Sequence, residues 1–134
     1  MRTLYKVIAL VSFFFIAITP AALAEYQWLQ DSTLKVTIET EEMIYEWEFE
    51  NPDLFEYEEG PFIWRGQKAK DSFEELLTIL DLSQPKLSED VIEEITDQYD
   101  LANRLTVKRV GLDHSMQTWV WNKIEIDKDP RKGE

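Results

Sequence analysis

Residues 44–50 read Ile44-Tyr45-Glu46-Trp47-Glu48-Phe49-Glu50, and apolar and acidic residues alternate in this stretch without a break. Successive side chains of a β-strand point to opposite faces of the sheet, so a period of two predicts a strand. One face of the strand would carry three aromatic rings, and the other would carry a row of glutamates. We expect a central strand with its aromatic side chains in the core and its glutamates on the open face beside lysines.

The first residues have the three parts of a secretory signal peptide. Arg2 and Lys6 precede an apolar run over residues 7–18, and Ala22 and Ala24 form a small-residue cleavage signal. The run has about 12 residues, whereas a bilayer span needs roughly 20. We therefore expect residues 1–24 to be a cleavable signal peptide of a secreted or periplasmic protein, with a retained membrane anchor as the alternative.

The remaining chain is strongly acidic and contains no cysteine. After cleavage, 12 basic side chains would face 27 acidic ones, which gives a net charge of −15. This charge disfavours nucleic acid and anionic lipid as partners and favours a basic protein or peptide. We expect no stable membrane insertion after cleavage. Export without any cysteine indicates a bacterial protein that folds without disulfides.

Three further segments complete the first half of the fold. Residues 34–39 alternate and would form a hairpin with the opening strand. Residues 62–64 are apolar and predict a short third strand. Residues 55–58 fit either an irregular strand or a partly paired loop. Asn51 and Pro52 would end the hairpin, because proline cannot donate to a strand ladder.

The second half predicts two helices and a closing hairpin. Apolar residues at helical spacing place one helix at about residues 68–80, and Ser88 is a good N-cap for a second helix that fades near residue 100. Residues 104–112 and 117–126 would then pair. The expected fold is α+β over residues 25–126: an antiparallel sheet of four to five strands with both helices on one face, followed by a flexible tail (127–134).

The closing hairpin contains the best candidate for a binding surface. Leu105 and Val107 would share one face and Val110 the other, with a bulge near Arg109 to reconcile them. In the last strand two faces compete for burial. If the aliphatic set Val120, Ile124 and Ile126 lies inward, an aromatic patch is exposed that would bind a protein, peptide or glycan. The patch consists of Trp119, Trp121 and Lys123.

Carboxylates are the most abundant chemical group and suggest three further hypotheses. Asp53, Glu56, Glu58 and Glu59 supply oxygen ligands of the kind that calcium prefers, but they lack an EF-hand spacing, and a solvated acidic surface is the alternative. The segment 51–61 is also an acidic loop that a secreted enzyme inhibitor would present. A cation-dependent structural domain is the third possibility.

Asp113-His114-Ser115 contains the residue types of a hydrolase triad, but three consecutive residues cannot converge as a triad must. A hairpin turn explains Asp113 and Ser115 directly. No other histidine and no cysteine occurs, which removes most zinc and copper sites. We expect no cofactor and no catalytic activity.

Several of these segments together resemble the YusW-like family of small exported bacterial proteins. The segments are Tyr45 to Asn51, then Arg65-Gly66-Gln67-Lys68-Ala69 before a leucine-rich helix, then Ser88-Glu89-Asp90-Val91-Ile92, and Leu105-Thr106-Val107-Lys108 in a closing hairpin. The resemblance covers most of residues 34–126, although Trp119 to Asn122 departs from it. It implies an exported, non-enzymatic module and supplies no site residues. We therefore expect a small exported module that binds or interacts with a partner.

Overall fold

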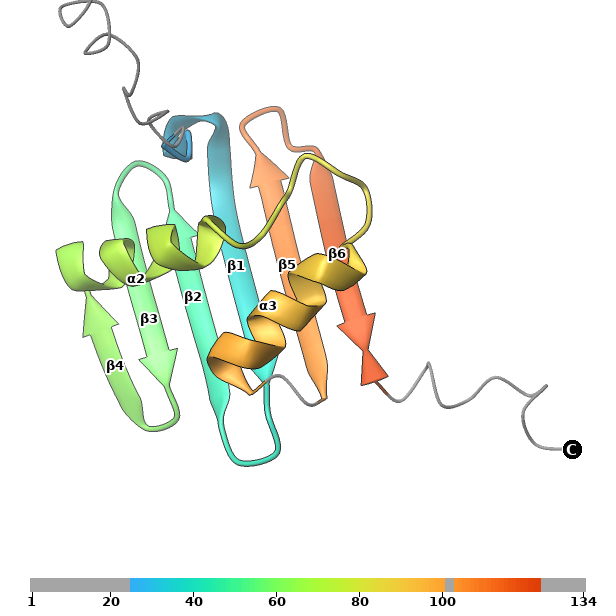
Figure 1. Cartoon of the computed structure of the whole chain (residues 1–134). Helices are drawn as coiled ribbons and strands as arrows, with labels where there is room; N and C mark the ends of the chain where they lie inside the picture. The colour runs from blue at the N-terminus through green and yellow to red at the C-terminus, as the bar shows by residue number, and fades with distance from the viewer. Residues whose placement is uncertain (1–24, 101–102, 124–134) are drawn as a thin grey trace, which may run out of the picture.

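The computed structural model describes residues 25–100 and 103–123. Six antiparallel strands form one sheet in the order β4-β3-β2-β1-β5-β6, and two α-helices cross one of its faces (Figure 1). The predicted signal peptide and tail lie outside the described residues, within which no helix is long and apolar enough to cross a bilayer. The strands are β1 (Asp31–Glu39), β2 (Ile44–Glu50), β3 (Leu54–Glu59), β4 (Phe62–Arg65), β5 (Arg104–Gly111) and β6 (Met116–Asn122). The helices are η1 (Trp28–Gln30, a single 3₁₀ turn), α2 (Gln67–Leu77) and α3 (Glu89–Tyr99).

The alternating stretch forms β2 and lies near the middle of the sheet, as predicted. Trp47 and Phe49 are fully buried beneath the helices, and Tyr45 is half-buried beside them. The glutamates of the same strand point away from the helices. We call the covered side the helix face and the opposite side the open face. Trp47 pairs directly with Val36 of β1, so the cores of the first two strands meet in one row.

The sheet has one strand more than the upper limit of the prediction. Residues 54–59 form a regular strand, β3, that pairs in register with β2 on one side and β4 on the other. Phe55 and Tyr57 alternate with glutamates as the residues of β2 do, and their rings pack on the helix face. The expectation of an acidic loop over residues 51–61 is therefore wrong. Only the two turns that flank β3 interrupt the ladder.

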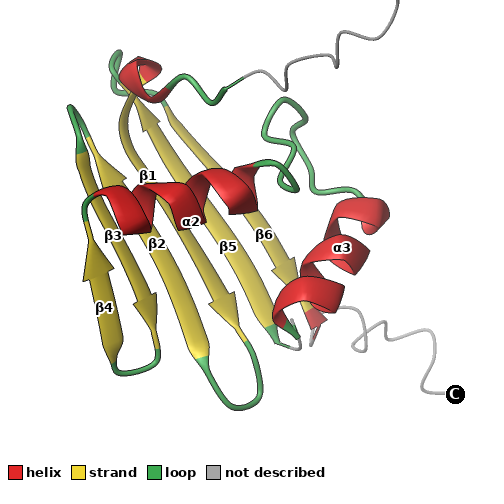
Figure 2. Cartoon of the chain, turned by 60° about the vertical axis from the view of Figure 1, so that its left-hand side comes forward, coloured by secondary structure: helices red, strands yellow, loops and turns green. Residues whose placement is uncertain are grey.

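Both helices pack on the helix face, as predicted (Figure 2). α2 buries Ala69, Phe73 and Leu76 at helical spacing. It begins after Gly66, which has a φ of 75° that other residues rarely adopt. The Ser88 hydroxyl accepts a hydrogen bond from the Val91 amide at 3.2 Å, which confirms it as the N-cap of α3.

Three indole groups, two in the sheet and one in the η1 turn, bond to α2 and to the segment that follows it. Trp47 Nε1 donates to the Ser72 hydroxyl at 3.0 Å, and Trp28 Nε1 donates to Glu74 at 3.1 Å. Trp119 Nε1 donates to the Gln84 carbonyl at 2.7 Å, in the segment between α2 and α3. A buried N–H without an acceptor would be destabilising. These bonds therefore fix where α2 and the following connection lie on the sheet.

A buried ion pair fastens the start of β1 to β5. Asp31 is fully buried, and its Oδ1 lies 2.7 Å from the Nε of Arg109, whose side chain is 21% exposed. The Tyr26 hydroxyl donates to the other carboxylate oxygen. The β1–β5 register shifts between Asp31 and Thr33, so the irregularity expected near Arg109 lies on the partner strand. This bulge turns Asp31 toward the helix face, where it meets Arg109.

We predict that Asp31 and Arg109 contribute unequally to the free energy of unfolding and that their contributions are not additive. Arg109→Met leaves a fully buried carboxylate without its cation and should lower the free energy of unfolding by about 3–5 kcal/mol. Asp31→Asn should be milder, because the Arg109 side chain retains access to water. Urea unfolding at pH 7 measures both. The double variant should lose less stability than the sum of the single losses, and strict additivity would contradict the coupling.

Candidate functional site

The open face of the sheet carries no helix in the part of the chain that the structure describes, and its two halves differ in charge. β2 and β3 place five carboxylates on it. β1 and β5 contribute three basic residues (Lys35, Lys108 and Arg104), one glutamate (Glu39, 3.7 Å from Arg104) and several threonines. An antiparallel sheet commonly leaves one face in water, so polarity alone is expected. Exposure to water does not explain why the acidic residues gather on β2 and β3 and most of the basic ones on β1 and β5. The five carboxylates of the acidic half are Glu46, Glu48, Glu50, Glu56 and Glu58.

Like charges oppose each other directly in the acidic half. The β2–β3 register pairs Glu46 with Glu58 and Glu48 with Glu56. Side chains that are directly opposite on neighbouring strands have Cβ atoms about 4.5–5.5 Å apart, and like charges in such positions are destabilising. A local arrangement that opposes stability is the kind of feature that marks a functional surface.

Two cations partly balance these carboxylates. Lys35 Nζ lies 2.7 Å from Glu46 Oε1, and Arg65 Nε lies 2.9 Å from Glu56 Oε2. The bond to Glu46 raises the pKa of Lys35. The expected pairing of lysines with these glutamates is thus confirmed for Lys35. Lys108 instead pairs with Lys35 and Thr118 across the strands, and Lys123 follows the end of β6.

Glu58 has the clearest electrostatic signature in the acidic half. Burial raises the pKa of its carboxyl group, and a hydrogen bond with Glu56 and repulsion from Glu46 and Glu48 raise it further. A raised pKa in an acid means that the folded state resists ionisation of that group. Five carboxylates against two paired cations leave the acidic half with a formal charge of −3.

A shallow hollow of about 360 Å³ lies at the end of the acidic half, where β2, β3 and β4 meet. Glu48, Glu50, Asp53 and Glu56 line it, and Arg65 stands at its side. Leu54, which is 60% exposed, contributes apolar surface. Such a lining offers carboxylates to a guanidinium or ammonium group and apolar surface to the methylene chain that carries it.

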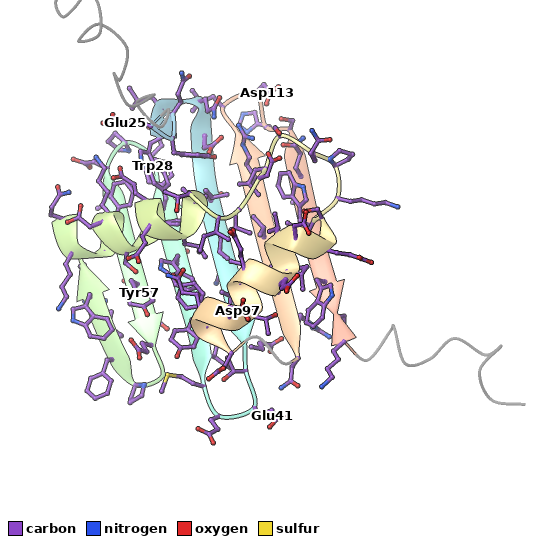
Figure 3. All side chains as sticks on the ribbon, in the orientation of Figure 1. Glu25, Trp28, Glu41, Tyr57, Asp97 and Asp113 are labelled. Atoms are coloured by element: carbon purple, nitrogen blue, oxygen red, sulfur yellow. The ribbon has the colours of Figure 1, made fainter. Side chains whose placement is uncertain are left out.

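The metal site suggested by Asp53, Glu56, Glu58 and Glu59 does not form. Among the described residues no three acidic, histidine or cysteine side chains come together in a way that could hold a metal ion. Strand geometry explains this result, because Glu58 and Glu59 point to opposite faces of β3. Glu59 Oε2 accepts a hydrogen bond from the Tyr57 hydroxyl at 3.1 Å on the helix face, where Figure 3 shows Tyr57.

The aromatic patch predicted at Trp119, Trp121 and Lys123 is wrong in its geometry. Trp119 is only 4% exposed and Trp121 is half-buried against the core, whereas Val120 is 57% exposed on the open face. β5 determines this orientation, because Val107 pairs with Trp119 and both lie under the helices. Ile124 lies outside the described residues. The register between β6 and β5 orients both tryptophans, since Leu105 and Val107 pair with Trp121 and Trp119.

This orientation predicts that substitutions at the neighbouring positions 119 and 120 have very different effects on stability. Trp119→Ala removes a buried ring and the hydrogen bond to Gln84, so it should lower the free energy of unfolding by about 3–5 kcal/mol. Val120→Ala should change it by no more than about 0.5 kcal/mol, because Val120 is exposed. Chemical denaturation followed by tryptophan fluorescence distinguishes the two. A larger loss at Val120 than at Trp119 would contradict the observed face.

Asp113, His114 and Ser115 form the turn between β5 and β6. Asp113 Oδ1 accepts hydrogen bonds from the Ser115 amide at 3.0 Å and the Ser115 hydroxyl at 2.6 Å, and these bonds lower the pKa of Asp113. His114 is exposed in a left-handed conformation with a φ of 67°. Asp113 lies at the end of the sheet opposite Glu41 (Figure 3). The three residues therefore close the β5–β6 hairpin, as predicted.

Comparisons with protein-family models, with curated proteins and with solved structures give no match. The resemblance to the YusW-like family therefore stays a prediction.

The repulsion at Glu58 predicts a pH-dependent gain in stability. Its raised pKa means that the folded state loses stability as the pH rises through that pKa, and the loss is absent below the ordinary pKa of a glutamate. Glu58→Gln should therefore raise Tm by about 2–4 °C at pH 7 and have no effect below about pH 4. Thermal unfolding monitored by circular dichroism at both pH values measures the effect.

Glu94→Gln is the matched control, since it removes an exposed acid on the outer side of α3. An equal gain from Glu94→Gln at pH 7 would show that net charge, and not the opposed pairs, sets the stability.

Proposed function

We propose that this protein is an exported, non-enzymatic binding module that docks a basic polypeptide on the acidic half of its open face. The observation that supports this most strongly is the hollow in which four carboxylates surround apolar surface. An arginine or lysine side chain fits such a lining because its methylene stem covers apolar atoms while its charge meets carboxylates.

The opposed glutamate pairs support the same partner. Bringing cationic groups between Glu48 and Glu56, and between Glu46 and Glu58, would replace repulsion with attraction. The partner would thereby remove the repulsion between glutamates that destabilises the free protein. A polyanion would increase this repulsion, so nucleic acid is disfavoured as a partner.

The flatness of the surface favours a polypeptide over a small cation. The carboxylates lie along extended strands on one side of the sheet, and none of the described ones converge into a metal-binding group. A row of spaced carboxylates matches a row of spaced basic side chains. Such contacts add electrostatic steering to binding and make it dependent on salt.

A four-site variant tests the proposal: Glu48→Gln, Glu50→Gln, Asp53→Asn and Glu56→Gln. We expect it to bind a fluorescent oligo-arginine peptide at least about tenfold more weakly than the unmodified protein, because four charged contacts are lost. Fluorescence anisotropy at low and physiological salt measures both affinities.

The control variant removes four exposed acids elsewhere: Glu41→Gln, Glu42→Gln, Glu93→Gln and Glu94→Gln. Both variants have the same net charge, so nonspecific attraction weakens equally. If the control loses as much affinity as the four-site variant, binding follows net charge and the docking surface is refuted.

A further inference from the structure

The proposed function leaves one exposed feature of the sheet unused, namely its edge at β6. Within the described residues, β6 pairs with β5 on one side and with no other strand. Its seven residues, Met116–Asn122, contain no charged side chain and no proline. Its register with β5 is unbroken over seven pairs, from Asn122 with Arg104 to Met116 with Val110. From Met116 to Val120, β6 is therefore a regular strand whose outer side pairs with no other described strand.

Natural sheets usually protect an edge with charges, proline, a bulge or a very short strand. The opposite edge follows this rule, because β4 has four residues, carries Arg65 and ends before the left-handed Gly66. β6 shows none of these devices. Met116 is 74% exposed and Val120 is 57% exposed on its open face. The chain is 31% charged, so an uncharged, exposed edge of this length is unusual for it.

We propose that the β6 edge binds a second copy of this chain in antiparallel orientation, so that two sheets join into one. A two-fold axis at Thr118 gives a self-complementary register. Met116 of one copy lies opposite Val120 of the other, and this apolar pair occurs twice. The two Thr118 side chains face each other at the centre, which is a favourable cross-strand pair.

The charges around β6 fit a second copy. In the same register Lys123 of each copy lies beside Asp113 of the other, which places opposite charges at both ends of the interface. The hairpin from residue 104 to residue 123 carries four basic residues and one aspartate, although the whole chain is acidic. A basic partner peptide would be repelled there. The acidic half lies on β2 and β3, three and four positions from β6 in the strand order.

Distance removes the repulsion expected between two acidic molecules. Neighbouring strands lie about 4.8 Å apart, so the acidic halves of the two copies would be roughly 30–40 Å apart. The Debye length is about 8 Å at physiological ionic strength. The joined sheet would also present two acidic halves on one surface, which would strengthen binding to a partner with several basic segments.

Sedimentation velocity of the protein across about 1 μM to 1 mM tests the pairing. We expect a monomer–dimer equilibrium in the micromolar to millimolar range, because an edge-to-edge contact buries little surface. The variant Met116→Lys with Val120→Lys places like charges opposite each other twice and should weaken dimerisation at least tenfold. Both positions are exposed, so circular dichroism should show an unchanged fold.

A charge-swap variant tests the register. Met116→Lys with Val120→Glu places a lysine of one copy opposite a glutamate of the other and should restore the dimer. The control, Leu29→Lys with Ile44→Lys, adds the same charge as the double-lysine variant at exposed apolar positions outside both the β6 edge and the hollow, and it should dimerise as the unmodified protein does. A monomer at every concentration, a dimer that survives the double lysine substitution, or a charge swap that fails to restore it would overturn the inference. The outcome does not depend on the oligo-arginine measurement.

Discussion

One row of directly opposed residues crosses the whole sheet on its helix face and fixes the orientation of every strand. Val36 lies at its centre and pairs with Trp47 on one side and Val107 on the other. These three side chains are fully buried. Because side chains alternate along each strand, a slip of one residue at any of these pairs would exchange the two faces of that strand. The row runs through Trp64, Tyr57, Trp47, Val36, Val107 and Trp119.

The same row accounts for the acidic half of the open face. Once Trp47 and Tyr57 face the helices, the residues on either side of them must face away, and these residues are glutamates on both strands. Burial of two aromatic rings contributes several kcal/mol, whereas one opposed pair of exposed like charges opposes folding by at most about 1 kcal/mol. Packing therefore determines the register, and the glutamate pairs persist because they are the weaker term. One substitution in each of the two opposed glutamate pairs would remove the repulsion without affecting the core.

The sequence predicts elements whose own pattern is sufficient and misplaces those that depend on a neighbour. β2, α2 and the N-cap of α3 follow from local periodicity, and each is found close to its expected position. The residues of β6 taken alone favour Val120 for the core over Trp119. The deciding information is its pairing with Val107, which is not visible in the strand itself. The ion pair between Asp31 and Arg109 spans 78 residues and depends on a bulge, so no local pattern indicates it.

Packing of the core does not determine which charged residues stand on the open face of each strand. Every position on the open face could carry a charged residue without disturbing the core, since its side chains point into solvent. Glutamates nevertheless concentrate on β2 and β3, basic residues concentrate on β5, and β6 carries neither. Solubility alone would favour charge at an exposed edge, because charges there prevent unwanted strand pairing. The fold thus separates an acidic surface on β2 and β3 from an uncharged edge at β6, with β1 and β5 between them.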